Sequence, residues 1–123
     1  MSVQSEVLSY FNQKKELYNT ILSFVLNESE NDADYKKIIE LIENQKIQEN
    51  TEETEDFLRL ISSISNNHKR NSFFMKRIEK ILIYISSSIK QTLSNLEIFE
   101  IFQNNPRILY FLQKNKIIDI TDE

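Results

Sequence analysis

His68 is the only histidine among the 123 residues, and the chain has no cysteine. An imidazole can act as a general base, but it then needs a group that orients it. His68 lies in a polar, basic segment beside Lys69 and Arg70, and the sequence indicates no such group. One histidine without cysteine cannot build a histidine-based metal site. We therefore interpret His68 as an ordinary surface residue.

The acidic residues raise two further possibilities, a calcium site and a pair of catalytic carboxylates. No start position between Glu28 and Asp32 supplies the oxygen ligands, the glycine and the final carboxylate of an EF-hand loop, so we exclude one. Glu97 and Glu100 lie one helical turn apart, a spacing that solvated helix faces produce often, and it does not support a glycosidase pair. No serine has a neighbour that would activate it as a nucleophile.

The chain also contains no glycine. Glycine lets the backbone approach a phosphate or adopt positive φ at little cost. Phosphate-binding loops, dinucleotide motifs and nucleophile elbows depend on it. We accordingly predict a protein that is not an enzyme, with no catalytic, cofactor-binding or metal-binding residues and no small-molecule substrate.

Positive charge is concentrated in one basic patch, residues 69–80, which contains Lys69, Arg70, Lys76, Arg77 and Lys80 around Phe73 and Phe74. Aromatic residues among basic ones can bind nucleic acid. The net charge of −4 argues against general affinity for nucleic acid. The two phenylalanines fit better as core residues at the start of a helix. A nucleic-acid-associated domain is kept as the alternative function.

The elements that position these residues are predicted to be helices. Apolar residues recur at steps of three and four through most of the chain, and no alternating run with a tight turn indicates a strand. In the first helix the apolar stripe is predicted to be Val3, Val7, Tyr10, Leu17, Ile21 and Phe24, widened by Phe11, Tyr18, Leu22 and Val25. We expect an all-α bundle or α-solenoid-like array of five or six helices, near residues 3–26, 35–46, 51–64, 74–93, 96–102 and 106–112.

Capping residues mark where these helices begin. Ser2 and either Asp32 or Asp34 are candidate caps of the first two, and the acidic run 28–34 is predicted to be a loop. Asn50 with Glu53, and Ser94 with Glu97, match the capping box. Asn105 followed by Pro106 fits the start of the last helix. The serines at 86–88 are expected to admit a close neighbour or let the fourth helix bend.

At 14.7 kDa the chain fits one domain. We assign residues 1–120 to a single helical domain and 121–123 to a tail. The first residues lack a basic segment followed by an apolar run, so we expect no secretory signal. No stretch approaches the roughly 18 apolar residues of a membrane span. We expect no membrane partner and a cytoplasmic, intracellular location, with the nucleus not excluded.

Five segments between Leu17 and Ile120 resemble a known group of proteins. They are 17–24 (LYNTILSF), parts of 38–50, 60–70 (LISSISNNHKR), 78–84 (IEKILIY) and 89–95 (IKQTLSN). Together they resemble the helical N-terminal region of a large group of ankyrin-repeat proteins, greatly expanded in trichomonad protists. The resemblance covers nearly the whole chain, and the Ser-Asn-Asn-His block is its most specific part.

Residues 105–115 are similar to the outer helix of a degenerate ankyrin repeat, with Asn115 where repeats usually have glycine. Asparagine is the best substitute for glycine in that left-handed turn. The preceding helix lacks the Thr-Pro-Leu-His signature, so the pair is a diverged cap at most. Residues 117–119 resemble the start of a connection to a next repeat.

The resemblance implies a domain that precedes and caps an ankyrin array, and such arrays bind proteins. The chain ends where the repeats should begin, so we expect either a truncated gene product or a domain that acts alone. We expect a non-enzymatic protein–protein interaction or capping module associated with ankyrin-repeat proteins. Without a following repeat, Ile117, Ile118 and Ile120 are expected to be exposed. We therefore expect self-association or a protein partner at the C-terminal helix pair, 96–102 with 108–112.

Overall fold

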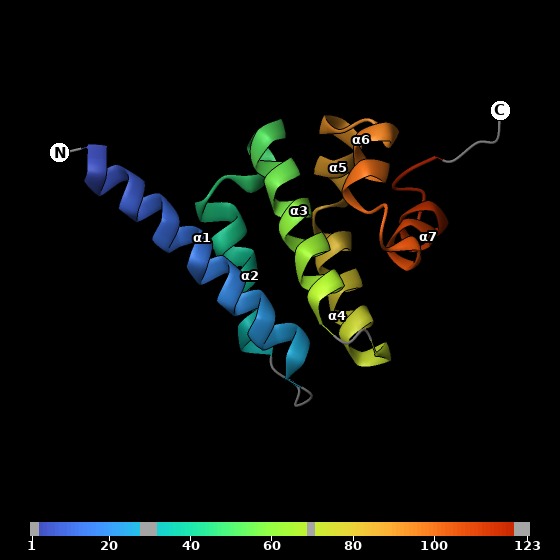
Figure 1. Cartoon of the computed structure of the whole chain (residues 1–123), viewed down its shortest axis with the longest axis horizontal. Helices are drawn as coiled ribbons and strands as arrows, with labels where there is room; N and C mark the ends of the chain where they lie inside the picture. Colours follow the sequence, from blue (N-terminus) through green and yellow to red (C-terminus); the bar gives the residue numbers. More distant parts are fainter. Residues whose placement is uncertain (1–2, 28–31, 69–70, 120–123) are drawn as a thin grey trace. The chain divides into compact units, whose positions relative to one another are not determined.

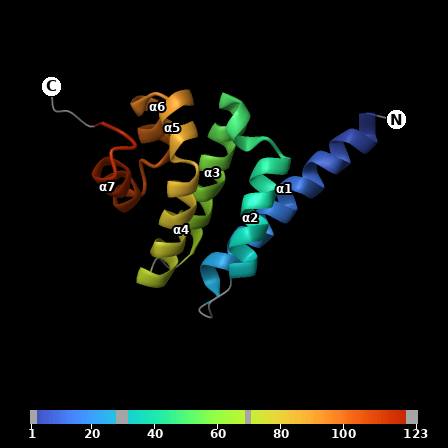
Figure 2. The same cartoon turned by 180° about the vertical axis from the view of Figure 1, so that it is seen from behind.

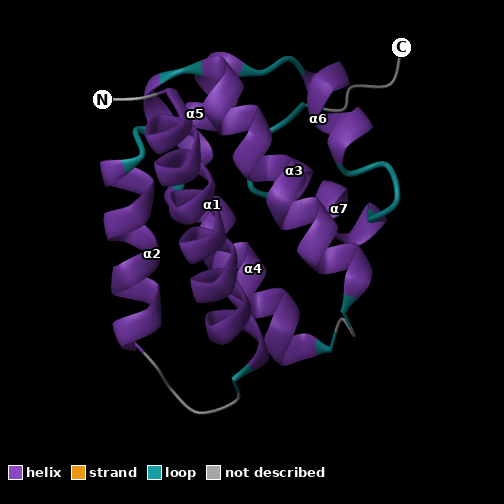
Figure 3. Ribbon diagram, turned by 60° about the vertical axis from the view of Figure 1, so that its left-hand side comes forward, coloured by secondary structure: helices purple, strands orange, loops and turns teal. Residues whose placement is uncertain are grey.

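The computed structural model describes residues 3–27, 32–68 and 71–119 (Figure 1). In that part of the chain every regular element is a helix, and no strand occurs (Figure 3). This confirms the all-α fold class. The chain forms two compact units, Met1–Gln45 and Lys46–Glu123, and each is described by itself. The prediction of a single domain over residues 1–120 stays a prediction.

Unit 1 is a hairpin of two unequal helices, α1 (Val3–Leu26) and α2 (Asp32–Asn44). Both views show α2 alongside the C-terminal half of α1 (Figures 1 and 2). The rings of Phe24 and Tyr35 lie 5.6 Å apart between their centroids, and Lys37 forms an ion pair with Glu16 at 3.3 Å. The buried side chains of this unit are Leu17, Ile21, Phe24, Val25, Ile38, Leu41 and Ile42.

The second helix begins earlier than the sequence predicts. Asp32 is already helical and Asp34 lies in the first turn. The predicted loop over residues 28–34 therefore does not include residues 32–34. The Ser23 hydroxyl donates to Asp34 Oδ2 at 2.8 Å and joins the end of α1 to the start of α2. Acidic side chains in a first turn are stabilised by the helix dipole. The proposed cap Ser2 and residues 28–31 lie outside the described residues.

The N-terminal half of α1 extends beyond α2. A helix of 24 residues is about 36 Å long, whereas one of 13 residues spans about 20 Å. Residues 4–13 of α1 are exposed at every position. The prediction that Val7, Tyr10 and Phe11 belong to the buried stripe is therefore wrong, because α2 is too short to cover them.

Unit 2 contains a 3-10 turn, η1 (Ile47–Glu49), and five α-helices. These are α3 (Thr51–Asn67), α4 (Ser72–Tyr84), α5 (Ser86–Thr92), α6 (Asn95–Ile101) and α7 (Pro106–Lys114). Helix α3 contacts η1, α5 and α6, and its buried face carries Phe57, Leu58, Ile61 and Ile64. The largest buried side chains from the other helices include Phe74, Met75, Ile78 and Phe102.

Two buried hydroxyls of α3 form hydrogen bonds with η1 and α6. Thr54 Oγ1 donates to the carbonyl of Ile47 at 2.7 Å, and Ser62 Oγ donates to the carbonyl of Ile101 at 2.8 Å. Ile101 is the last residue of α6, where backbone carbonyls lack helical partners. The hydroxyls therefore join η1 and α6 to the long central helix.

Three predicted N-caps of unit 2 are confirmed. The side chain of Asn50 accepts a hydrogen bond from the backbone N–H of Glu53, and that of Asn105 accepts one from Ile108, with Pro106 at the first helical position. Ser94 and Glu97 form a complete capping box. Asn71 caps α4 in the same way through the N–H of Phe74.

The predicted fourth helix is divided in two, which raises the number of α-helices in the described residues to seven. The break is at Ile85, whose φ of −100° and ψ of 12° leave the helical region. Ile85 is fully buried, and the chain continues directly into α5. Within α5, Ser88 Oγ donates to Gln48 Oε1 of η1 at 2.8 Å, so the small serine admits a close neighbour as predicted.

The C-terminal end of α7 corrects the expectation that Asn115 takes the left-handed turn position. Asn115 has a φ of −92°, and the left-handed residue is Lys116 at 60°. The N–H groups of Lys116 and Ile117 bond to the carbonyls of Gln113 and Leu112, which is the Schellman arrangement with lysine in the usual glycine position.

The folded-back end buries the isoleucines that were expected to be exposed. Ile117 and Ile118 are both buried, because the Schellman turn directs the chain back onto the unit. The carbonyl of Asp119 accepts a hydrogen bond from Asn95 Nδ2 at 2.6 Å. Ile120 lies outside the described residues. Exposure of Ile117 and Ile118 therefore no longer supports self-association through the C-terminal helix pair.

Candidate functional site

His68 caps the end of α3. Its Nδ1 lies 3.0 Å from the carbonyl of Ile64, a contact that places the ring proton on Nδ1. The ring also stacks on Phe74, with centroids 6.4 Å apart. Both contacts hold the imidazole against the helix end, where a C-terminal carbonyl otherwise lacks a donor. The structure therefore gives His68 a structural role.

The polar side chains that carry pKa shifts also serve the fold. Hydrogen bonds from the backbone N–H and the hydroxyl of Ser94 lower the pKa of Glu97. Glu97 is thus engaged in the capping box, and the structure does not orient it with Glu100 as a carboxylate pair. Burial raises the pKa of the Tyr35 hydroxyl. Within the described ranges, no three acidic or histidine side chains come close enough to hold a metal ion.

The basic patch is only partly within the described residues, because Lys69 and Arg70 lie outside them. Lys76 and Lys80 are exposed one turn apart on α4. The Arg77 guanidinium lies 4.5 Å from the centroid of the Phe73 ring, a cation–π contact. Phe74 is buried in the core as predicted. Phe73 is half-buried and contacts Arg77.

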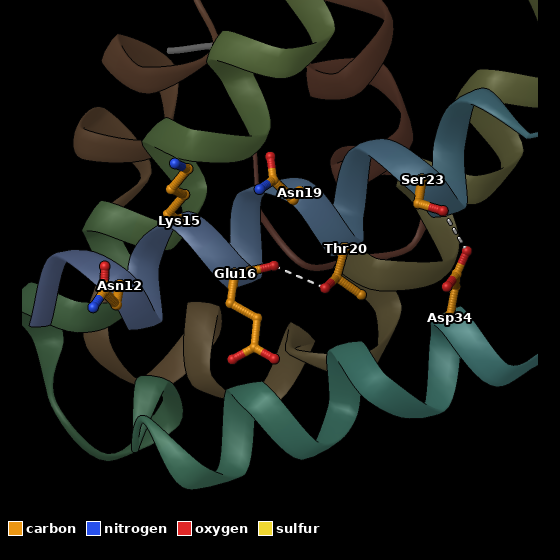
Figure 4. A pocket seen from close by; sticks show the side chains of 7 residues that line it. All are labelled: Asn12, Lys15, Glu16, Asn19, Thr20, Ser23 and Asp34. Atoms are coloured by element: carbon orange, nitrogen blue, oxygen red, sulfur yellow. Dashed lines mark hydrogen bonds between the residues drawn. The ribbon is translucent and has the colours of Figure 1, made fainter. Parts of the chain in front are cut away.

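A shallow hollow of about 430 Å³ lies along α1 and the start of α2 (Figure 4). The Thr20 hydroxyl donates to the carbonyl of Glu16 at 2.8 Å, and Ser23 is bonded to Asp34. The Glu16 carboxylate pairs with Lys37. These polar groups form hydrogen bonds and an ion pair within unit 1, and neither hydroxyl is positioned as an activated nucleophile. The lining residues are Asn12, Lys15, Glu16, Asn19, Thr20, Ser23 and Asp34.

The largest departure from an ordinary polar surface is on α1. Val7, Leu8, Tyr10 and Phe11 are 46%, 61%, 44% and 62% exposed, and we call these four residues the α1 apolar surface. Single exposed apolar residues are normal, but contiguous apolar patches on soluble proteins commonly mark interaction sites. The sequence assigned Val7 and Tyr10 to the core instead. The unequal predicted lengths of the first two helices were the signal that part of α1 would lack a partner.

Charged and aromatic groups border the α1 apolar surface. Glu6, Tyr10 and Lys14 follow one another at steps of four, so they form a single ridge along the helix. The Lys14 ammonium lies 5.2 Å from the centroid of the Tyr10 ring. Tyr10 and Phe11 are in edge-to-face contact, with centroids 6.2 Å apart. The ridge therefore has a negative end, an aromatic centre and a positive end.

Comparison with protein-family models, with curated proteins and with solved structures gave no match to this chain. The resemblance to the N-terminal region of ankyrin-repeat proteins therefore stays a prediction. Among the described residues, no helix is both long enough and apolar enough to cross a membrane.

Proposed function

We propose that this chain is a non-enzymatic protein–protein interaction module. The observation that carries the proposal is the α1 apolar surface, where two of the four side chains are more than 60% exposed. Burying exposed apolar area against another protein is the dominant favourable contribution to most association. Tyrosine and phenylalanine are also the residue types enriched where proteins bind one another.

The non-enzymatic part of the proposal is supported by what the polar side chains already do. His68 and Glu97 cap helices, and Ser62 joins α3 to α6. Catalytic groups require a nucleophile, a base and an orienting partner converging on one reactant position. His68, Glu97 and Ser62 instead bond to backbone groups of the fold.

The association with ankyrin-repeat proteins is a second part of the proposal. It is supported by the resemblance of residues 105–115 to an outer helix, and by the capped helices α6 and α7 at that end of the chain. Leu96 on α6 and Tyr110 on α7 are large exposed apolar residues that a neighbouring helical repeat would cover. A cytoplasmic location belongs to the same proposal.

Photo-crosslinking inside the cells that make the protein tests the interaction function. A photoreactive phenylalanine analogue in place of Phe11 is expected to give a defined covalent adduct with a protein identified by mass spectrometry. The matched control carries the analogue at Lys36, an exposed residue on α2 of the same unit. Equal adduct yields at the two positions, or none at either, would contradict the proposal.

The alternative function is binding of nucleic acid through the basic patch. It is favoured by one observation, the exposed pair Lys76 and Lys80 on the same face of α4. Binding would have to weaken steeply as salt rises, because phosphate contacts release counterions. Titration of fluorescent DNA and RNA oligonucleotides at about 50 mM salt separates the two functions. Binding lost in Lys76→Glu/Lys80→Glu would favour this alternative.

A further inference from the structure

We propose that the partner of the α1 apolar surface is a second copy of the same chain, paired antiparallel through the N-terminal halves of two α1 helices. This inference rests on the proposed interaction function and names its partner. Three features support it. They are the order of charges along the ridge Glu6–Tyr10–Lys14, the part of α1 that α2 does not cover, and the exposed apolar side chains beside the ridge.

The ridge Glu6–Tyr10–Lys14 of one copy is complementary in charge to the same ridge of a second copy that runs antiparallel to it. About a two-fold axis at Tyr10, Glu6 of each copy faces Lys14 of the other, and the two Tyr10 side chains meet at the centre. A two-fold interface uses the same patch on both subunits, so one favourable pair always occurs twice. Parallel pairing would instead place Glu6 beside Glu6 and Lys14 beside Lys14, which is repulsive.

The adjoining ridge supplies the apolar contacts. Val7 lies three residues before Tyr10 and four before Phe11, so Val7 is a surface neighbour of both side chains. Leu8 lies two residues before Tyr10 and therefore on the opposite side of the helix, outside the paired face. Antiparallel helices with such a stripe pack side chains between one another as in short coiled coils.

The hairpin of unit 1 leaves room for this arrangement. Helix α2 covers only the C-terminal half of α1, as both views show (Figures 1 and 2). In an antiparallel pair centred on Tyr10, the two covered halves point away from each other. Each α2 therefore lies at one end of the paired segment, and Gln45, directly after α2, marks the limit of that segment by donating from its Nε2 to the carbonyl of Gln13 at 3.0 Å.

The small area of the α1 apolar surface indicates a weak dimer. Stable interfaces bury about 800 Å² on each partner, and roughly ten to twelve residues of one helix face provide less than that. We therefore expect a reversible dimer with a dissociation constant on the order of tens of micromolar. Sedimentation equilibrium of the full chain, from about 5 to 500 µM, measures this constant directly.

Charge-reversed variants test the register. Glu6→Lys places two lysine side chains opposite each other, and Lys14→Glu places two acids together, so each variant alone is expected to dimerise about tenfold more weakly. A mixture of the two variants forms a mixed dimer in which both end pairs are attractive again, and the double exchange in one chain likewise restores both. Recovery in the mixture and in the double variant is the expected result. Equal weakening in all of these samples would overturn the antiparallel register.

Two apolar residues of α1 provide a matched test. Val7→Ser is expected to raise the dissociation constant about tenfold, because Val7 lies one turn from Tyr10 on the paired face. Leu26→Ser is the control, since Leu26 is exposed on the same helix outside that segment. Circular dichroism verifies that every variant keeps its helical content.

The outcomes separate this inference from the proposed function. A monomeric wild-type chain at all concentrations, with an adduct at Phe11 to a different protein in cells, overturns the dimer and leaves the interaction function standing. A monomer with no adduct overturns both. A dimer that Val7→Ser and the charge reversals leave unchanged uses another surface and also overturns the inference.

Discussion

At the scale of single residues, the described part of the chain uses lysine where other proteins use glycine. Lys46 and Lys116 both have φ near 60°, the left-handed region that costs a residue with a Cβ atom about 1–2 kcal/mol. The described asparagines that cap helices in unit 2, such as Asn50 and Asn105, have negative φ. The expectation that Asn115 takes the left-handed turn position is therefore wrong. Asn50 and Asn105 serve instead as side-chain acceptors at helix starts.

Lys116→Gly is expected to raise the free energy of unfolding by about 0.5–1 kcal/mol, because glycine removes the strain but adds entropy to the unfolded chain. Lys116→Ala is the control, since alanine keeps the Cβ atom and therefore the strain. Urea denaturation measures both. An equal effect of the two substitutions would show that loss of the lysine side chain, and not the backbone conformation, determines the result.

Glu97 makes stability depend on pH in a defined direction. Its pKa in the folded protein is lowered from an ordinary value of 4.5 by hydrogen bonds from Ser94. The stabilisation is therefore fully present above the ordinary pKa and is lost as the pH falls through the lowered one.

Glu97→Ala is expected to reduce stability at pH 7, and its difference from the wild type should shrink steadily as the pH falls below about 4. Glu100→Ala, on the same short helix, controls for the removal of one negative charge. Urea denaturation at a series of pH values measures both. A difference that stayed constant with pH would assign the effect of Glu97→Ala to helix propensity.

At the scale of elements, the helix starts of unit 2 could be predicted because each is encoded locally. Asn50, Ser94 and Asn105 need only a backbone N–H two or three residues ahead, and that partner is fixed by the helix itself. The break at Ile85 could not be located so closely. It depends on how α5 meets η1, which is a tertiary contact between Ser88 and Gln48. The serines at 86–88 indicated only that the helix could bend near them.

The candidate site could not be predicted from residue pattern alone. Val7 and Tyr10 continue the same apolar stripe as Leu17 and Ile21, so periodicity assigned all four to the core. Burial, however, requires an element that covers the stripe, and α2 ends too soon. Periodicity identifies the face of a helix that is suited to contact, but not the partner that makes the contact.

Two serines one turn apart on α3 give an element-scale prediction. Ser62 donates to the Ile101 carbonyl, while buried Ser65 Oγ has no hydrogen-bond partner among the described residues. Ser62→Ala is expected to cost about 1 kcal/mol, because it leaves a buried carbonyl without its donor. Ser65→Ala is expected to be neutral or slightly stabilising. Equal losses in thermal or urea unfolding would contradict the assigned hydrogen bond.

At the scale of the whole molecule, dimerisation would link stability to concentration. A partner that binds only the folded state raises the melting temperature by mass action. We expect the melting temperature of the wild type to rise by about 1–3 °C between roughly 5 and 500 µM protein. Val7→Ser should show a smaller rise over that range, as measured by calorimetry. A concentration-independent wild type would agree with a monomer and contradict the dimer.

The unequal lengths of α1 and α2 have a consequence for amide hydrogen exchange. Residues 4–13 have helical backbone bonds but no covering element within unit 1, and short unsupported helical segments are only marginally stable in water. Their amides should exchange with solvent far faster than those of residues 17–25, which lie under α2. One unbroken helix thus has two local stabilities, and its first half becomes long-lived only when another surface protects it.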